Sequence, residues 1–183
     1  MDYETKPTCR KDIRKFAFIM RSVFGVPPTG RFPVLDALDK IPDVFKGSNY
    51  VIVEDQELPP KIMAQCTPND AGGFTIEIKK TVYMGAYEKH IGAFLGFICH
   101  EICHLFLFYI GFTPIYARSF EEGTIPAYRS VEWQAKALCG EVMIPFDESR
   151  GMTAKEIQQT YQVSESFAKY RIKESSKKRR NVR

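Results

Sequence analysis

Residues 91–112, IGAFLGFICHEICHLFLFYIGF, form the most apolar stretch of the chain and place His100, Glu101 and His104 inside it. A run of 22 residues is long enough to cross a membrane. Three ionisable groups within five positions would be costly in lipid without partner helices, and the sequence offers no second hydrophobic span to supply them. The stretch therefore predicts a buried central helix, and we expect no membrane association.

The five residues from His100 to His104 have the pattern H-E-x-x-H. Residues four apart lie on one face of a helix, so the two imidazoles can bind one ion while Glu101 stands beside it. Two neutral imidazoles leave most of the charge on a zinc ion, and a carboxylate that does not ligate can then take a proton from its water and pass it to a leaving amine. The pattern predicts a zinc peptidase with one Zn²⁺ per chain, His100 and His104 as ligands, and Glu101 as general base and then acid.

A catalytic zinc ion needs a third protein ligand. The remaining histidine, His90, lies ten residues before His100, which is about 15 Å along a shared helix and too far to bind the same ion. A second helix is predicted over residues 130–144, where Glu132 and Glu141 fall on nearly opposite sides. Small residues beside Glu132 would let the two helices approach closely, which favours Glu132 as the ligand. The alternative is a solvated helix-start glutamate stabilised by the helix dipole.

The remaining segments predict a single α+β domain. We expect that domain over residues 1–172, made of an N-terminal helical part (1–49), a catalytic core (50–150) and a C-terminal helical hairpin (151–172), followed by a basic, disordered tail (173–183). Apolar periodicity, β-branched residues and N-caps predict helices at 12–24, 34–40, 153–161 and 164–172, and strands at 50–54, 61–66 and 74–79.

The strand at 74–79 has a strict apolar/polar alternation, with Phe74, Ile76 and Ile78 on one face. This pattern is typical of a half-exposed strand and suggests a sheet edge. An edge strand beside the active helix could pair with an extended peptide, so these three residues are candidates for substrate binding. A plain edge strand without that role fits the pattern equally well.

The cysteines and the N-terminal residues indicate the cellular compartment in which we expect the protein. The first ten residues, MDYETKPTCR, lack the basic-then-apolar layout of a secretory signal, so we expect a cytoplasmic protein. Five cysteines without an export signal are expected to be reduced thiols. Two of them, Cys99 and Cys103, lie about 100° from the histidine face, and we expect them to pack as small buried residues.

Charge is distributed unevenly along the chain. Residues 150–183 carry ten basic and three acidic residues, a net +7, whereas residues 1–149 carry sixteen and nineteen, a net −3, which together give the +4 of the whole chain. The basicity therefore belongs to the C-terminal segment, and we do not expect nucleic acid as the main partner.

The run from His100 to Leu105, followed about 25 residues later by Glu132-Trp133-Gln134-Ala135 and then by Glu141 to Pro145, resembles the ImmA/IrrE family of metallopeptidases. The likeness covers roughly residues 50–172. Two departures stand out: Cys103 and Cys139 replace residues that are more often small, and Gln134 replaces a commoner glutamate.

The resemblance implies a minimal zincin-like fold, in which a small mixed or antiparallel sheet packs on the active-site helix and C-terminal helices complete the domain. It also implies a zinc-dependent endopeptidase with Glu132 as third ligand. The better-understood members cleave helix-turn-helix repressors of phages, mobile elements or stress responses. The expected partner is therefore such a repressor, and the expected role is regulation of transcription by cleavage at few sites.

Two other functions remain open. Residues 153–172 also resemble a helix-turn-helix, and the basic tail could contact phosphate, which would indicate a DNA-binding or regulatory protein. The second of these helices carries few polar side chains for reading bases, which weighs against that function. A non-proteolytic metal-binding homologue is the other alternative, because an intact Glu101 is necessary for hydrolysis but not sufficient.

Overall fold

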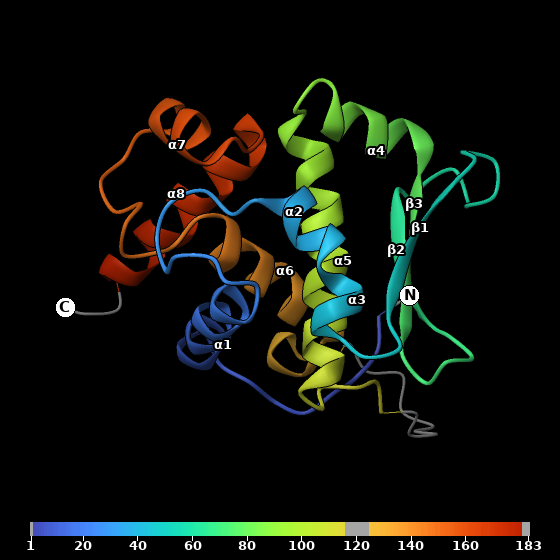
Figure 1. Ribbon diagram of the computed structural model, residues 1–183. Helices are drawn as coiled ribbons and strands as arrows, with labels where there is room; N and C mark the ends of the chain where they lie inside the picture. The colour runs from blue at the N-terminus through green and yellow to red at the C-terminus, as the bar shows by residue number, and fades with distance from the viewer. Residues whose placement is uncertain (1, 116–124, 181–183) are drawn as a thin grey trace.

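The computed structural model describes residues 2–115 and 125–180, with side chains as far as Glu174. Helix α5 (Gly92–Tyr109) runs through the middle of the molecule, between the sheet on one side and α6 (Val131–Met143) on the other (Figure 1). Helix α1 (Arg10–Val23) packs on α6. The predicted central helix and the second predicted helix are therefore both present and adjacent.

The sheet has three strands, β1 (Asn49–Val53), β2 (Ala64–Pro68) and β3 (Phe74–Lys79), in the order β1-β3-β2. Strands β1 and β3 are parallel, and β2 is antiparallel to β3. Helices together with a small mixed sheet confirm the α+β class that the sequence predicts.

Strand β3 is the central strand of this sheet, so its prediction as an edge strand is wrong. Both of its sides pair with a neighbouring strand, and Ile76 and Ile78 are completely buried. Phe74 packs its ring 5.1 Å from that of Phe108 on α5. These residues therefore belong to the core and cannot pair with a peptide. The apolar/polar alternation indicates that one face of the strand is buried, but it does not show which strands pair with it on either side.

The remaining helices complete the domain. They are α2 (Val34–Asp39), α3 (Ile41–Val44), α4 (Lys80–Tyr87), the 3-10 turn η1 (Ala127–Arg129), α7 (Ala154–Tyr161) and α8 (Glu165–Arg180). The α4 helix follows β3 directly and was not predicted from the sequence.

Helix α8 continues through residues 173–180, which corrects the prediction of a disordered tail from residue 173. An ion pair between Arg10 of α1 and Glu174 ties this part of the helix to the domain. Such a long-range contact is not visible in the local composition, which is simply polar and basic. Residues 181–183 lie outside the described part of the chain.

Helix α5 supplies much of the core. Ile98, Cys99, Ile102, Cys103 and Leu105 are fully buried, as the prediction of a buried central helix requires. Within the described residues α5 alone is long and apolar enough to cross a membrane by length and composition, and half of it is buried inside the protein. A core helix satisfies the same criteria.

The start of α5 touches the connection between α7 and α8. A Cβ atom at Gly92 would lie 2.5 Å from the carbonyl carbon of Val163 and 2.7 Å from the backbone nitrogen of Ser164. Gln162 turns the chain there with a left-handed φ of 55°. Only glycine permits this approach, and it places α8 beside the histidine-bearing helix.

Candidate metal centre

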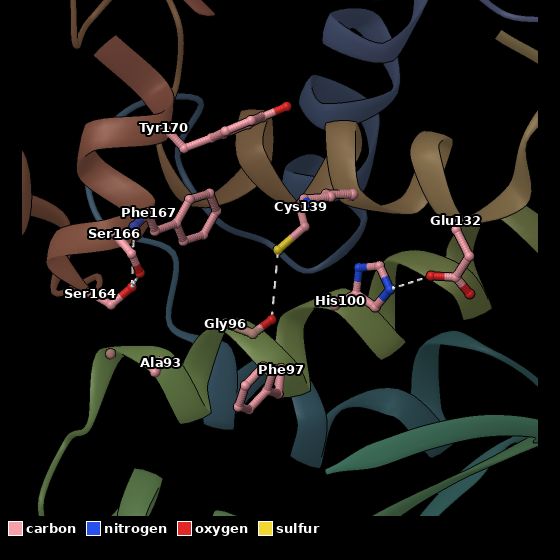
Figure 2. Close-up of a pocket in the computed structure, with 12 residues that line it drawn as sticks. Ala93, Gly96, Phe97, His100, Glu132, Cys139, Ser164, Ser166, Phe167 and Tyr170 are labelled. Carbon is pink, nitrogen blue, oxygen red and sulfur yellow. Dashed lines mark hydrogen bonds and ion pairs between the residues drawn. The ribbon is translucent and has the colours of Figure 1, made fainter. Parts of the chain in front are cut away.

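Three side chains from α5 and α6 converge at one point. The Nε2 atoms of His100 and His104 are 3.1 Å apart. The carboxylate of Glu132 lies 3.3 Å from the first of these nitrogens through Oε2 and 3.4 Å from the second through Oε1. Figure 2 shows Glu132 reaching from α6 toward His100 on α5. These three side chains form a group that could hold a metal ion.

The spacing of these side chains is close to that needed for a single zinc ion. With bonds of about 2.0–2.1 Å from metal to nitrogen or oxygen, tetrahedral geometry separates neighbouring ligand atoms by about 3.3 Å. The two Nε2 atoms are 3.1 Å apart, and each lies 3.3–3.4 Å from a different oxygen of the Glu132 carboxylate, Oε2 for His100 and Oε1 for His104. Little movement of the side chains is therefore needed for all three to bind one ion.

The other sequence candidates lie elsewhere. His90 sits in the turn before α5 with a left-handed φ of 49° and is not part of the group. Glu141 is 4% exposed and accepts hydrogen bonds of 3.1 and 2.7 Å from the guanidinium of Arg171. The choice of Glu132 over Glu141 from helix packing therefore agrees with the observed geometry.

Electrostatics couple Glu132 to the imidazoles. Hydrogen bonds from His100 and His104 lower the pKa of the Glu132 carboxyl well below its ordinary value. Burial lowers the pKa of His100, but the hydrogen bond to Glu132 and the charge of Glu101 outweigh it, so the net pKa is raised. Without metal, the group is therefore a hydrogen-bonded ion pair whose proton must leave when an ion binds.

Glu101 occupies a different environment from Glu132. Burial raises the pKa of its carboxyl, and the neighbouring charges of His100 and His104 oppose that rise only in part. A backbone hydrogen bond from Cys66 of β2 also acts on this carboxyl group. A carboxyl group with a raised pKa, held between the histidines and the sheet, has the properties of a general base.

The N-terminal segment holds the start of α6 in place. Ser130 caps the helix by accepting the backbone N–H of Trp133 at 2.8 Å. Asp2 accepts both the Ser130 hydroxyl at 2.6 Å and the backbone N–H of Glu132 at 3.1 Å. The Gln134 amide donates to the backbone carbonyl of Lys6 at 2.7 Å. No sequence motif indicates that Asp2 supports this site, since it lies 130 positions from Glu132.

A cavity of about 530 Å³ opens beside His100 and Glu132. His100 and Glu132 lie at one side, and Phe167 and Tyr170 of α8 lie across from them (Figure 2). Phe97, from the preceding turn of α5, adds to a mostly apolar lining. The cavity gives a large apolar group access to the candidate metal ligands. Its α8 wall could not be placed from the sequence, because it depends on the close contact at Gly92.

Comparison with known proteins adds no further identification. No protein-family model matches the chain, and no curated protein is similar enough in sequence to count as a relative. The resemblance to the ImmA/IrrE family therefore depends on the motif residues alone and stays a prediction. Two histidines and a glutamate are therefore arranged so that they could hold a metal ion beside a buried carboxyl group and an open cavity.

Proposed function

We propose that the protein is a zinc-dependent endopeptidase in which His100, His104 and Glu132 hold the ion. The observation that carries this proposal is the convergence of the two imidazole nitrogens and the Glu132 carboxylate within 3.4 Å of one another. Two imidazoles and one carboxylate form a ligand set used by catalytic zinc, which keeps a fourth position for water or substrate. The adjoining cavity supplies the space for that fourth position.

Zinc and Glu101 would have different roles in peptide hydrolysis. Zinc at this position supplies a Lewis acid that makes water a nucleophile at neutral pH. The Glu101 carboxylate accepts the proton of the attacking water and later delivers it to the leaving amine nitrogen. Burial favours that transfer, because a carboxyl group with a raised pKa holds the proton more readily than an exposed one.

The substrate is proposed to be a protein that binds in an extended form. With β3 enclosed, the sheet edge beside α5 belongs to β2, and the Cys66 backbone of β2 contacts Glu101. A peptide paired with β2 would therefore pass close to the general base. The apolar cavity would receive a large hydrophobic side chain. Together with the family resemblance, this supports a helix-turn-helix repressor cut at few sites in the cytoplasm, and slow degradation of general substrates such as casein.

The segment that resembles a helix-turn-helix is better explained as part of the peptidase domain. Ala168 and Arg171 of α8 are buried, and Arg171 is joined to Glu141 of α6. Exposed Lys169 is paired with Glu165 along the same helix. Because this face of α8 packs against the rest of the domain, fewer of its side chains are free to contact a DNA groove. Salt-dependent binding to duplex DNA would revive the alternative.

The decisive experiment measures metal content by elemental analysis in protein purified without a metal-affinity tag. We expect about one zinc per chain in the wild type and in Glu101→Gln, and almost none in Glu132→Ala. No bound metal in the wild type after zinc is supplied would rule out the peptidase. Retained zinc without cleavage of any co-expressed repressor, in wild type as in Glu101→Gln, would instead indicate the non-proteolytic homologue.

A further inference from the structure

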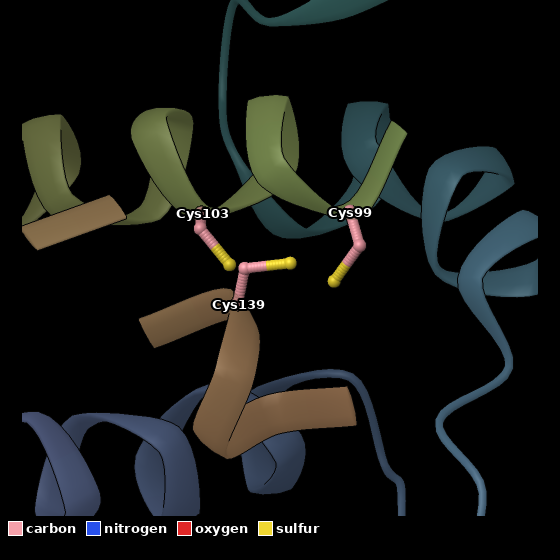
Figure 3. A group of neighbouring side chains, drawn as sticks. All are labelled: Cys99, Cys103 and Cys139. Carbon is pink, nitrogen blue, oxygen red and sulfur yellow. The ribbon is translucent and has the colours of Figure 1, made fainter. Parts of the chain in front are cut away.

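Three buried cysteines meet between α5 and α6. Cys99 and Cys103 of α5 and Cys139 of α6 have their sulfur atoms within 4.8 Å of one another, and we call these three residues the thiol cluster. Figure 3 shows all three sulfurs pointing into the same space between the helices. Cys99 and Cys103 are indeed buried, as expected from the sequence, but that expectation did not include Cys139, which comes from the other helix.

The sulfur separations suit coordination of a single ion. A trigonal site with metal–sulfur bonds of about 2.3 Å places its sulfurs about 4 Å apart. The thiol cluster is already near that spacing, so small rotations of the side chains would bring the three atoms to one ion. All three residues are at least 95% buried, which keeps competing water away from the position.

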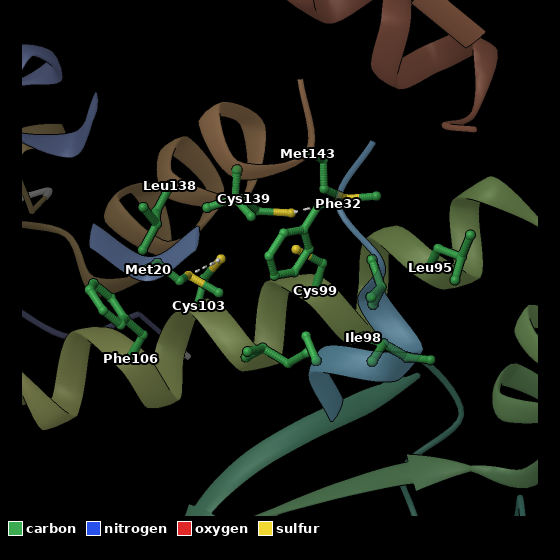
Figure 4. Close-up of a cluster of buried hydrophobic side chains, with 14 of the residues drawn as sticks. Met20, Phe32, Leu95, Ile98, Cys99, Cys103, Phe106, Leu138, Cys139 and Met143 are labelled. Atoms are coloured by element: carbon green, nitrogen blue, oxygen red, sulfur yellow. Dashed lines mark hydrogen bonds between the residues drawn. The ribbon is translucent and has the colours of Figure 1, made fainter. Parts of the chain in front are cut away.

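Two methionines add further soft donors around the thiol cluster. The thioether of Met20 lies 4.0 Å from the Cys103 sulfur, and that of Met143 lies 3.8 Å from the Cys139 sulfur. Figure 4 shows both methionines beside the cysteines within the core. Thiolates and thioethers together favour Cu(I). A tetrahedral zinc ion would need a fourth ligand, and among the described residues the side-chain atoms that contact the cysteine sulfurs from outside the cluster are these two thioethers.

A buried cation adjoins the thiol cluster. Arg21 is 1% exposed, and its guanidinium donates to backbone carbonyls, including those of Val142 and Thr29. In the described part of the chain, no carboxylate lies within ion-pair distance of it, and it interacts electrostatically with Glu148 and, more weakly, with Cys99. A buried anionic site needs nearby positive charge, and Arg21 provides it.

An ion can reach the thiol cluster from the surface. Cys139 is 5% exposed and lines the same cavity as His100 and Glu132. In Figure 2 its sulfur points toward the Gly96 carbonyl at the floor of that cavity. The cavity therefore supplies an entry path, which a plausible metal site requires.

We infer that Cys99, Cys103 and Cys139 form a binding site for a single cuprous ion, separate from the candidate zinc site and built on the same two helices. Each thiol that becomes a ligand releases its proton to solvent, and copper remains Cu(I), so no electron is transferred. The site does not depend on the proposed peptidase activity. An ion held there would fasten α5 to α6, the two helices that carry all three candidate zinc ligands.

The test uses Cu(I) itself and the full-length double variant Cys9→Ser/Cys66→Ser, which retains only the thiol cluster. The protein is titrated without oxygen against a colorimetric cuprous chelator, and the bound copper is characterised by X-ray absorption. We expect one Cu(I) per chain with sulfur as its only ligand type. Adding Cys139→Ala should lower the affinity by more than about 100-fold, beyond the usual effect of an outer-sphere partner.

A second variant separates this site from the histidines. His100→Ala/His104→Ala in the same background should still bind one Cu(I), whether or not the proposed peptidase is correct. The proposal is overturned if no tightly bound Cu(I) forms in the double variant, if nitrogen ligands appear and vanish with the histidines, or if zinc displaces the copper at equal concentration. If Cys139→Ala does not fold by circular dichroism, the ligand type and the histidine variant decide the result.

Discussion

Glu132 and Glu141 lie nine residues apart on α6 and have opposite environments. The Glu132 side chain is 51% exposed and faces two imidazoles, whereas that of Glu141 is 4% exposed and faces the guanidinium groups of Arg171 and Arg14. Nine positions turn a helix through two and a half revolutions, so the two carboxylates point to opposite sides. One side of α6 therefore serves the candidate metal centre, and the other fastens the helix to α1 and α8.

Substitution of Glu141 tests the side of α6 that faces α1 and α8, and it should have the largest effect on the free energy of unfolding. Glu141→Ala removes the carboxylate that two guanidinium groups contact, and breaking a buried pair in this way costs about 3–5 kcal/mol of unfolding free energy. Urea denaturation measures the loss. Lys169→Ala is the matched control, since it breaks an exposed pair with Glu165 and should cost about 1 kcal/mol or less. Equal losses in the two variants would contradict this assignment.

Substitution of Glu132 tests the other side of the helix. Glu132→Ala should lower zinc affinity by more than about 100-fold, because it removes a direct ligand rather than a supporting group. Its effect on the urea midpoint of the metal-free protein should be small, since an exposed ion pair contributes little. Competition with a fluorescent chelator measures the affinity. If Glu132→Ala instead lost much stability and kept its zinc affinity, Glu132 would be the structural residue and not the zinc ligand.

The pH dependence of the metal-free protein should report on Glu132. Its pKa is lowered from the ordinary 4.5, so its stabilising contribution is present above that value and is lost as pH falls through the lower, folded value. The pKa of His100 is raised from 6.5, so its contribution is complete below 6.5 and is lost as pH rises through the higher, folded value. The stability difference between wild type and Glu132→Ala should therefore be largest between about pH 5 and 6.5.

Measurement of that difference requires urea midpoints for both proteins across the pH range. A difference that does not vary with pH would show that the ion pair is absent in solution. With zinc bound, the trend at acid pH should be steeper, because protons compete with the metal for both imidazoles.

The smallest effect concerns the helix cap that supports Glu132. Ser130→Ala should cost about 1 kcal/mol, the usual value for an N-cap, and should also weaken zinc binding because the start of α6 keeps only one of its two hydrogen bonds to Asp2. Thr153→Ala is the matched control. It removes the cap of α7, at a similar cost in stability, and should leave zinc affinity unchanged. Weaker zinc binding in both variants would point to a general loosening of the fold.

Local patterns were sufficient for the elements whose residues lie close together in sequence. The H-E-x-x-H spacing brings His100 and His104 to one face by helix geometry alone. Both predicted major helices form: α5 begins one residue after the predicted start and ends three residues before the predicted end, and α6 lies one residue inside its predicted bounds at each end. The same periodicity separated Glu132 from Glu141. These features depend on the rise and turn of a single helix, which the sequence encodes directly.

Long-range features could not be obtained in this way. The alternation of Phe74 to Lys79 did not reveal that β1 and β2 flank that strand, and the basic composition after residue 172 did not reveal the anchor between Arg10 and Glu174. Asp2 under Glu132 and Cys139 beside Cys99 are further examples. Each depends on which segments meet after folding.

The sequence by itself determined the central helix, the pair of histidines with their adjacent glutamate, and the α+β class, because short-range periodicity fixes all three. The tertiary structure decided the strand order, the approach of Glu132 to the two histidines, the cavity beside His100 and the meeting of three thiols. The physical reason is that packing between α5 and α6 sets these distances, and packing is a property of two surfaces rather than of either segment alone.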